Sequence, residues 1–153
     1  MKLGQHFDLG EFLRSEAAAR SGRSIETPPD EVVGELLRLV QSVLDPLRAS
    51  IGRPIAILSG YRPPWLNQKV GGAKNSDHLY GRAADLIVAG MKNHEVCQRA
   101  KELALPVKQA ILEFPPAGWV HLSIDPVGQP PKREYLTAVK SGSKTVYLPG
   151  TLA

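Results

Sequence analysis

The sequence predicts a single α+β domain in which helices pack on a small, mostly antiparallel sheet. Its 153 residues suit one compact domain. Hydrophobic residues make up 42% and charged residues 22%, the balance of a globular protein that buries a continuous core. Short apolar runs alternate with segments of helical periodicity, and no internal repeat or low-complexity linker separates them. We therefore expect one domain over residues 1–153, with its core at about 7–136.

The first third of the chain is predicted to be helical. A short helix is expected over residues 8–20. A longer helix follows, for which Thr27 is the expected cap and Pro28–Pro29 form the first turn. Apolar residues then recur at the spacing of one helical face over 32–47. Pro46 is expected to stop or bend this helix, because proline lacks the N–H group that the helix needs.

The remainder of the chain is predicted to supply the sheet. Short apolar runs followed by glycine or proline are typical of buried strands. The proline-rich segment 115–118 joins two such runs and predicts a hairpin, and a second hairpin is expected at an edge of the sheet over 134–148. Strands are predicted over 55–58, 83–88, 107–114 and 119–124, and helices over 63–70 and 93–103, the second capped by Asn93.

Charge and cysteine content exclude several classes of protein. The formal net charge of +4 favours anionic partners, but Lys and Arg are scattered and form no basic stripe interleaved with aromatic residues. We therefore expect no nucleic-acid partner. A single cysteine excludes an internal disulfide framework and a cysteine-based zinc cage. Any metal site must consist of histidines and carboxylates.

The expected location follows from hydropathy. No stretch approaches the roughly 20 apolar residues that span a bilayer. The start of the chain, residues 1–8, lacks the apolar core of a signal peptide. We expect a protein that is cytoplasmic as synthesised, that reaches any extracellular substrate only after release, and that is a monomer.

The densest group of polar residues lies between Ser76 and Asp85. It contains His78 and ends on Asp85, with glycine and alanines between them that allow backbone segments to approach closely. A further histidine, His121, lies within an apolar strand. Two imidazoles and one carboxylate leave a fourth position open, as in catalytic zinc sites. From these residues alone, a buried structural histidine and a turn-forming aspartate are equally good interpretations.

Several motifs occur together in an order and spacing typical of a known family. They are Ser59–Arg62, Asn67, Gly71–Gly72, the Ser-x-His-x-x-Gly-x-Ala-x-Asp pattern over 76–85, and Trp119–His121. From residue 7 to about 125 the chain thus resembles the M15 zinc peptidases, the family of D-Ala-D-Ala carboxypeptidases and endolysins. It is similar in particular to the compact phage and prophage branch. The resemblance implies a fold like that of hedgehog and D-Ala-D-Ala peptidase domains, with zinc on the sheet.

The resemblance also implies roles for particular residues. His78, Asp85 and His121 would bind one Zn²⁺ ion. Arg62 would act in catalysis and substrate binding by holding the substrate or the developing oxyanion, a task that suits a permanently charged guanidinium. Ser76 would line the site and bond the substrate.

The general base is where the sequence departs from the family. Members place Glu or His within a few residues before the last zinc histidine, but residues 117–120 here are Ala-Gly-Trp-Val. Glu113, at the end of the preceding strand, is the favoured candidate because strand pairing would bring it near the metal ligands. Asp125 and Asp77 are the alternatives. The orientation of Glu113 depends on the strand register, which the sequence does not reveal.

The expected function is a zinc-dependent peptidase that hydrolyses stem or bridge peptides of peptidoglycan. Either an endolysin-like endopeptidase or a D-Ala-D-Ala carboxypeptidase is consistent with the resemblance, and a phage or prophage setting fits the expected location. The alternative is a catalytically silent zinc-containing module of the same fold that binds the cell wall, since the usual base before His121 is missing.

Overall fold

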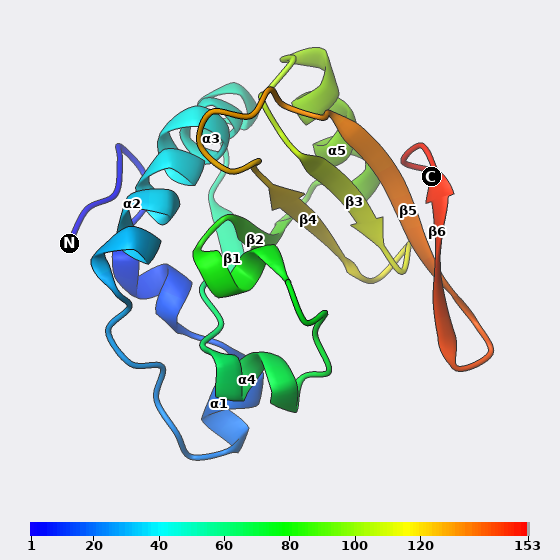
Figure 1. Cartoon of the computed structure of the whole chain (residues 1–153). Coiled ribbons are helices and arrows are strands. Elements are labelled where there is room, and N and C mark those ends of the chain that lie inside the picture. Colours follow the sequence, from blue (N-terminus) through cyan, green and yellow to red (C-terminus); the bar gives the residue numbers. More distant parts are fainter. Residues whose placement is uncertain (153) are drawn as a thin grey trace.

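A six-stranded sheet forms the centre of the computed structural model, which describes residues 1–152 (Figure 1). The strand order is β1-β2-β4-β3-β5-β6, and every neighbouring pair is antiparallel except β3 and β5, which are parallel. This architecture confirms the predicted α+β class. The strands are β1 (Ile55–Ser59), β2 (Ala83–Val88), β3 (Gln109–Glu113), β4 (Trp119–Ser123), β5 (Glu134–Ser141) and β6 (Lys144–Pro149).

Helices cover one face of the sheet and border the other. The alternate residues Leu86, Leu112, Val120 and Leu122 are almost completely buried and belong to the same apolar cluster as the helical residues of the covered face. The intervening residues point to the opposite face, because side chains alternate along a strand. The helices are η1 (Leu9–Leu13), α1 (Glu16–Arg20), α2 (Asp30–Leu39), η2 (Val40–Leu44), α3 (Asp45–Ile51), α4 (Pro64–Lys69), η3 (Asp77–Tyr80) and α5 (Asn93–Glu102).

Two predictions about the first helices are wrong. The segment 8–20 is two short helices, because the backbone becomes extended at Arg14 and a new helix starts after Ser15, whose side chain accepts the Ala18 N–H. The second helix begins at Asp30, with Pro29 at its cap position, so Thr27 lies outside it. An N-terminal proline needs no N–H partner, which explains why the helix begins directly after the proline pair.

Pro46 does not end the long helix, which continues to Ile51. The segment before it, η2, is a π-helical turn in which the Asp45 N–H bonds to the Val40 carbonyl, five residues back. Proline ordinarily clashes with the carbonyl four residues back, and a wider turn relieves that clash. The helix instead ends at Gly52, whose left-handed φ of 72° stops it.

Asn93 is the first residue of α5 and not its cap, a position held by Lys92. Its side-chain amide instead donates to the Gly118 carbonyl at 3.0 Å, which ties α5 to the turn between β3 and β4. None of the helices within residues 1–152 has the length and apolar character that crossing a bilayer requires.

Candidate metal centre and catalytic site

Strand pairing and a short helix bring His78, Asp85 and His121 together. Asp85 on β2 is directly opposite His121 on β4, so their side chains leave the same face of the sheet. His78 lies on η3, immediately before β2. One ligand atom from each residue lies within 4.8 Å of the other two, close enough to hold a single metal ion.

His78 is held in one orientation by the backbone of Gly60. The Nδ1 atom of His78 lies 2.7 Å from the Gly60 carbonyl oxygen, and because a carbonyl only accepts, Nδ1 carries the proton. The side chain is 1% exposed, and burial lowers the pKa of the imidazole against the opposing effect of Asp85. His78 is therefore neutral, with its Nε2 lone pair free.

That lone pair makes His78, together with Asp85 and His121, a suitable binding site for a cation. Nε2 of His78 is buried, has no hydrogen-bond partner within residues 1–152, and faces the Oδ1 atom of Asp85 at 3.3 Å. The same oxygen lies 3.0 Å from Nδ1 of His121. A buried acceptor that faces a carboxylate is unfavourable unless a cation lies between them. A tetrahedral zinc ion, which prefers neutral imidazole and carboxylate, suits this donor set.

Asp85 is ionised despite its burial. Burial raises the pKa of this carboxyl, but the neighbouring His78 and His121 lower it more, so the pKa lies well below its ordinary value. Asp85 therefore offers a negatively charged ligand at every physiological pH.

A network of ion pairs fixes η3 below the site. Asp77 pairs with Lys108 at 2.8 Å and with Arg82 at 3.8 Å, and Arg82 continues to Glu35 on α2 at 3.2 Å. Gly81 ends η3 at φ 76°, where a Cβ atom would lie 2.6 Å from a backbone oxygen of α2. The Asp77 carboxylate is thus already paired with two cations.

Glu113 lies on the same sheet face as the ligand group. It is opposite Trp119, two residues from His121 along β4, and the next pair on the same face is Ile111 with His121. Burial raises its pKa, and the charges of His121, Asp85 and Arg62 also act on it, which places it among these groups. Asp125, by contrast, accepts the Lys132 N–H at 3.1 Å in the loop after β4.

Arg62 and Ser76 complete the polar surroundings. A terminal nitrogen of Arg62 lies 3.5 Å from Oγ of Ser76, and Oγ also accepts the His78 N–H. Burial lowers the pKa of Arg62, while Asp85 and Glu113 oppose that shift. Its Nε is buried without a partner within residues 1–152, so the guanidinium retains capacity for a further acceptor.

Trp119 lines two cavities, one of which also reaches Asp85. A cavity of about 970 Å³ runs from Asp85 and Trp119 along β1 to the η1–α1 segment. A second, of about 790 Å³, lies between Trp119, the 115–118 turn and the start of α5. The first cavity reaches Asp85, a candidate metal ligand, and is large enough for several residues of a peptide.

Two imidazoles and one carboxylate, from a short helix and two paired strands, with a carboxyl and a guanidinium beside them, are the components of a single-metal hydrolase. The sequence matches the family model described as Peptidase M15 over residues 5–123. The chain therefore belongs to the M15 peptidase family, which confirms the resemblance to its zinc metallopeptidases.

One curated relative is the zinc D-Ala-D-Ala carboxypeptidase of Streptomyces albus G. It is 48% identical over 44 residues, which is 28% of this chain and 17% of the relative. The matched segment thus spans less than a fifth of that protein.

Sequence reasoning missed two positions that lie close to the candidate site residues. Gly60 was recognised only as part of a motif, although its carbonyl sets the His78 tautomer. Tyr147 on β6 gave no signal, because it comes near Glu113 only through the pairing of β3 with β5 and of β5 with β6.

Proposed function

We propose that the protein is a zinc-dependent peptidase that hydrolyses peptide bonds of peptidoglycan stem or bridge peptides. The observation that carries the proposal is the buried His78 Nε2 atom, which faces Asp85 and His121 without a proton of its own. Membership of the M15 family and the similarity to a D-Ala-D-Ala carboxypeptidase support peptidoglycan as the substrate. His78, Asp85 and His121 would hold the ion.

Zinc at this position would supply Lewis acidity, which acidifies a water molecule toward a pKa of roughly 7 and polarises the scissile carbonyl. The protein's own groups do the rest. Glu113 accepts the proton of the attacking water and delivers it to the leaving amine, a role for which a raised pKa is well suited. Arg62 hydrogen-bonds the carbonyl oxygen as negative charge develops on it. Ser76 orients Arg62 and the adjoining substrate group.

The alternative of a silent wall-binding module rested on the missing base before His121. Glu113 lies on the same face of the neighbouring strand β3, two residues from the partner of His121, and offers a carboxyl in place of that base. We therefore favour the enzyme. We extend the proposal to endolysin-like lysis of the cell wall by a phage- or prophage-encoded protein, with the net charge of +4 favouring retention at an anionic wall.

The test is digestion of purified peptidoglycan by the zinc-loaded protein, with and without a chelator, followed by mass spectrometry of the soluble products. Fragments that disappear with chelator establish the peptidase. Loss of only terminal D-Ala identifies a carboxypeptidase, and cleavage within the stem or bridge identifies an endopeptidase. Intact peptidoglycan of several wall types, with zinc bound, would refute the proposal and leave the binding module.

A further inference from the structure

The C-terminal hairpin of β5 and β6 lies outside the segment that matches the family model, which ends at residue 123. It joins the sheet through a parallel pairing of β5 with β3, the strand that carries Glu113. The hairpin therefore extends the face on which the candidate metal ligands lie (Figure 1).

One row of residues crosses the sheet from the site to the edge of this hairpin. Trp119 pairs with Glu113, Glu113 with Ala138, and Ala138 with Tyr147. Paired residues point to the same face, so Glu113 and Tyr147 flank Ala138 on the site face. Their backbones are two strand spacings apart, about 10 Å, which a glutamate and a tyrosine side chain can jointly bridge.

Ala138 leaves space for that approach. It is completely buried, and its methyl group is the smallest side chain that β5 could present between the two larger residues. Burial raises the pKa of Tyr147, and the negative charge of Glu113 raises it further, so the phenol group lies within electrostatic reach of that carboxyl. A small residue on the middle strand allows the larger side chains of the two outer strands, here Glu113 and Tyr147, to approach each other.

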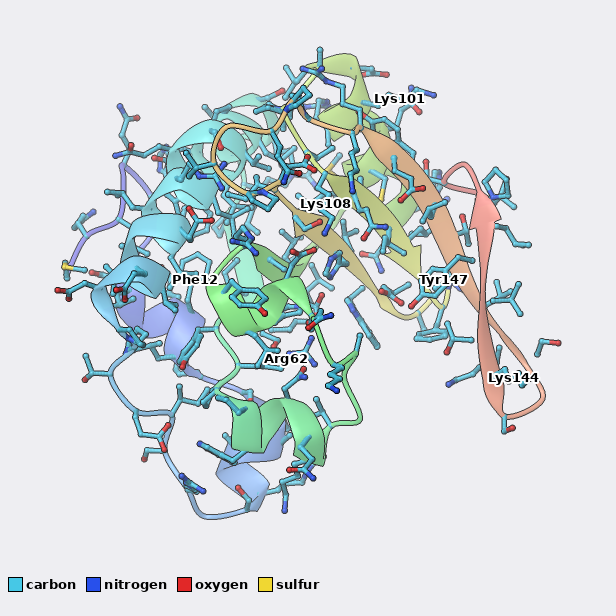
Figure 2. All side chains as sticks on the ribbon, in the orientation of Figure 1. Phe12, Arg62, Lys101, Lys108, Lys144 and Tyr147 are labelled. Atoms are coloured by element: carbon cyan, nitrogen blue, oxygen red, sulfur yellow. The ribbon has the colours of Figure 1, made fainter. Side chains whose placement is uncertain are left out.

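Tyr147 nevertheless keeps a large surface for a ligand. Its side chain is 52% exposed, and Figure 2 shows it on the hairpin side of the sheet, across from Arg62. The charge of Glu113 acts on both residues, so its carboxyl lies near Arg62 and near Tyr147. An exposed tyrosine offers an apolar ring and a hydrogen-bonding hydroxyl, a combination enriched where proteins contact peptides.

We propose that Tyr147 is a substrate-positioning residue, which forms the wall opposite Arg62 and hydrogen-bonds the backbone of a stem peptide bound over Glu113. The inference rests on the proposed function and specifies its substrate contact. The ring packs against small side chains of the peptide, and the hydroxyl bonds a carbonyl or carboxylate oxygen. A peptide held between Arg62 and Tyr147 presents its scissile bond to Glu113.

The test measures binding separately from turnover. Zinc-loaded Glu113→Gln protein is titrated with the soluble stem pentapeptide L-Ala-D-Glu-L-Lys-D-Ala-D-Ala by calorimetry, alone and combined with Tyr147→Phe or Tyr147→Ala. We expect Tyr147→Phe to raise Kd about 3- to 10-fold, the loss of one hydrogen bond, and Tyr147→Ala to raise it at least about 10-fold. In the active protein the same variants raise KM more than they lower kcat.

Leu148→Ala is the matched control, because Leu148 is the next residue of β6 and points to the other face with 36% exposure. It should leave Kd within about two-fold. Equal Kd values for the parent, Tyr147→Ala and Leu148→Ala would overturn the inference alone. Equal increases in Kd for Tyr147→Ala and Leu148→Ala would also overturn it, because they would indicate a disturbed hairpin. If the Glu113→Gln protein does not bind the peptide and the protein with Glu113 intact digests neither the peptide nor peptidoglycan, the proposed function fails and the inference falls with it.

Discussion

The Nδ1 atom of His78 donates to the carbonyl oxygen of Gly60 at a distance of 2.7 Å. This bond places the free lone pair of the imidazole on Nε2, toward Asp85 and His121. In metal-binding histidines, a hydrogen bond from the ring nitrogen that does not bind the metal fixes the tautomer and the orientation of the ring. The metal centre thus depends on the backbone position of a residue that is not itself a ligand.

Gly60→Ala should weaken zinc binding and stability together. A Cβ atom at this position would lie 2.7 Å from Cα of Phe12, so the backbone must move and the carbonyl loses its alignment with His78. We expect a loss of about 1–3 kcal/mol in the free energy of unfolding and a zinc content below one ion per chain. Thermal unfolding and elemental analysis measure both.

Gly34→Ala is the control for that substitution. A Cβ atom on Gly34, within α2, meets nothing within 4 Å, so alanine should stabilise the helix by about 0.5–1 kcal/mol and leave zinc unchanged. A Gly60→Ala protein with full zinc and unchanged stability would show that the carbonyl does not control His78.

Removal of the metal should destabilise the protein. An ion that binds the folded state stabilises it according to its concentration relative to Kd, by about 4 kcal/mol at a thousand-fold excess. Dialysis against a chelator should therefore lower Tm, and added Zn²⁺ should restore it. Asp85→Asn keeps the shape of the side chain but removes its charge, and its Tm should respond far less to either treatment. Identical zinc responses in both proteins would argue against Asp85 as a ligand.

The Glu35 carboxylate should make stability depend on acidic pH. Burial raises its pKa, but hydrogen bonds and charges from Arg38 and Arg82 lower it more, so the folded pKa lies below the ordinary 4.5. A lowered pKa in the folded state means stability that is present above about 4.5 and is lost as pH falls through the folded pKa. Glu35→Gln should cost about 1–3 kcal/mol at pH 7, and the difference from wild type should shrink below pH 4.5.

Urea unfolding of both proteins between pH 3 and pH 7 measures this effect. Glu102→Gln serves as control, since Glu102 is 59% exposed in the last turn of α5, and its effect should stay within about 0.5 kcal/mol at every pH. If Glu35→Gln changes the free energy of unfolding by the same amount at every pH between 3 and 7, the pKa of Glu35 is not lowered in the folded protein.

Cys97 should be inert until the protein unfolds. Its side chain is completely buried in the apolar core beneath the sheet, and burial raises the pKa of the thiol to about 12. Only the thiolate reacts rapidly with disulfide reagents. Native protein at pH 8 should therefore react orders of magnitude more slowly with Ellman's reagent than protein in concentrated urea. Fast native labelling would mean that α5 opens readily from the sheet.

The sequence was most informative where local chemistry determines local structure. Alternating or continuous apolar runs correctly predicted the strands at 83–88 and 119–124, since burial of one face imposes that pattern. The residues from Ser76 to Asp85 were singled out by composition and motif. Their convergence with His121 then follows from the pairing of β2 with β4.

Properties that depend on distant partners could not be predicted. The orientation of Glu113 is set by register with Trp119, and a shift of one residue would have turned it to the other face. The parallel pairing of β3 with β5 joins segments through a long connection, which leaves no local signal for the approach of Tyr147. Pro46 is tolerated only because η2 is a π-helical turn, a conformation that the apolar spacing does not distinguish from an α-helix.

The most direct test of the central claim compares wild-type and Glu113→Gln proteins for zinc content and for hydrolysis of the soluble stem pentapeptide. We expect one zinc ion per chain in both proteins and a decrease in kcat of about 10²–10⁴-fold in the variant, because the proposed metal ligands remain and the proton acceptor is lost. Full activity of Glu113→Gln with zinc bound would show that Glu113 is not the proton acceptor.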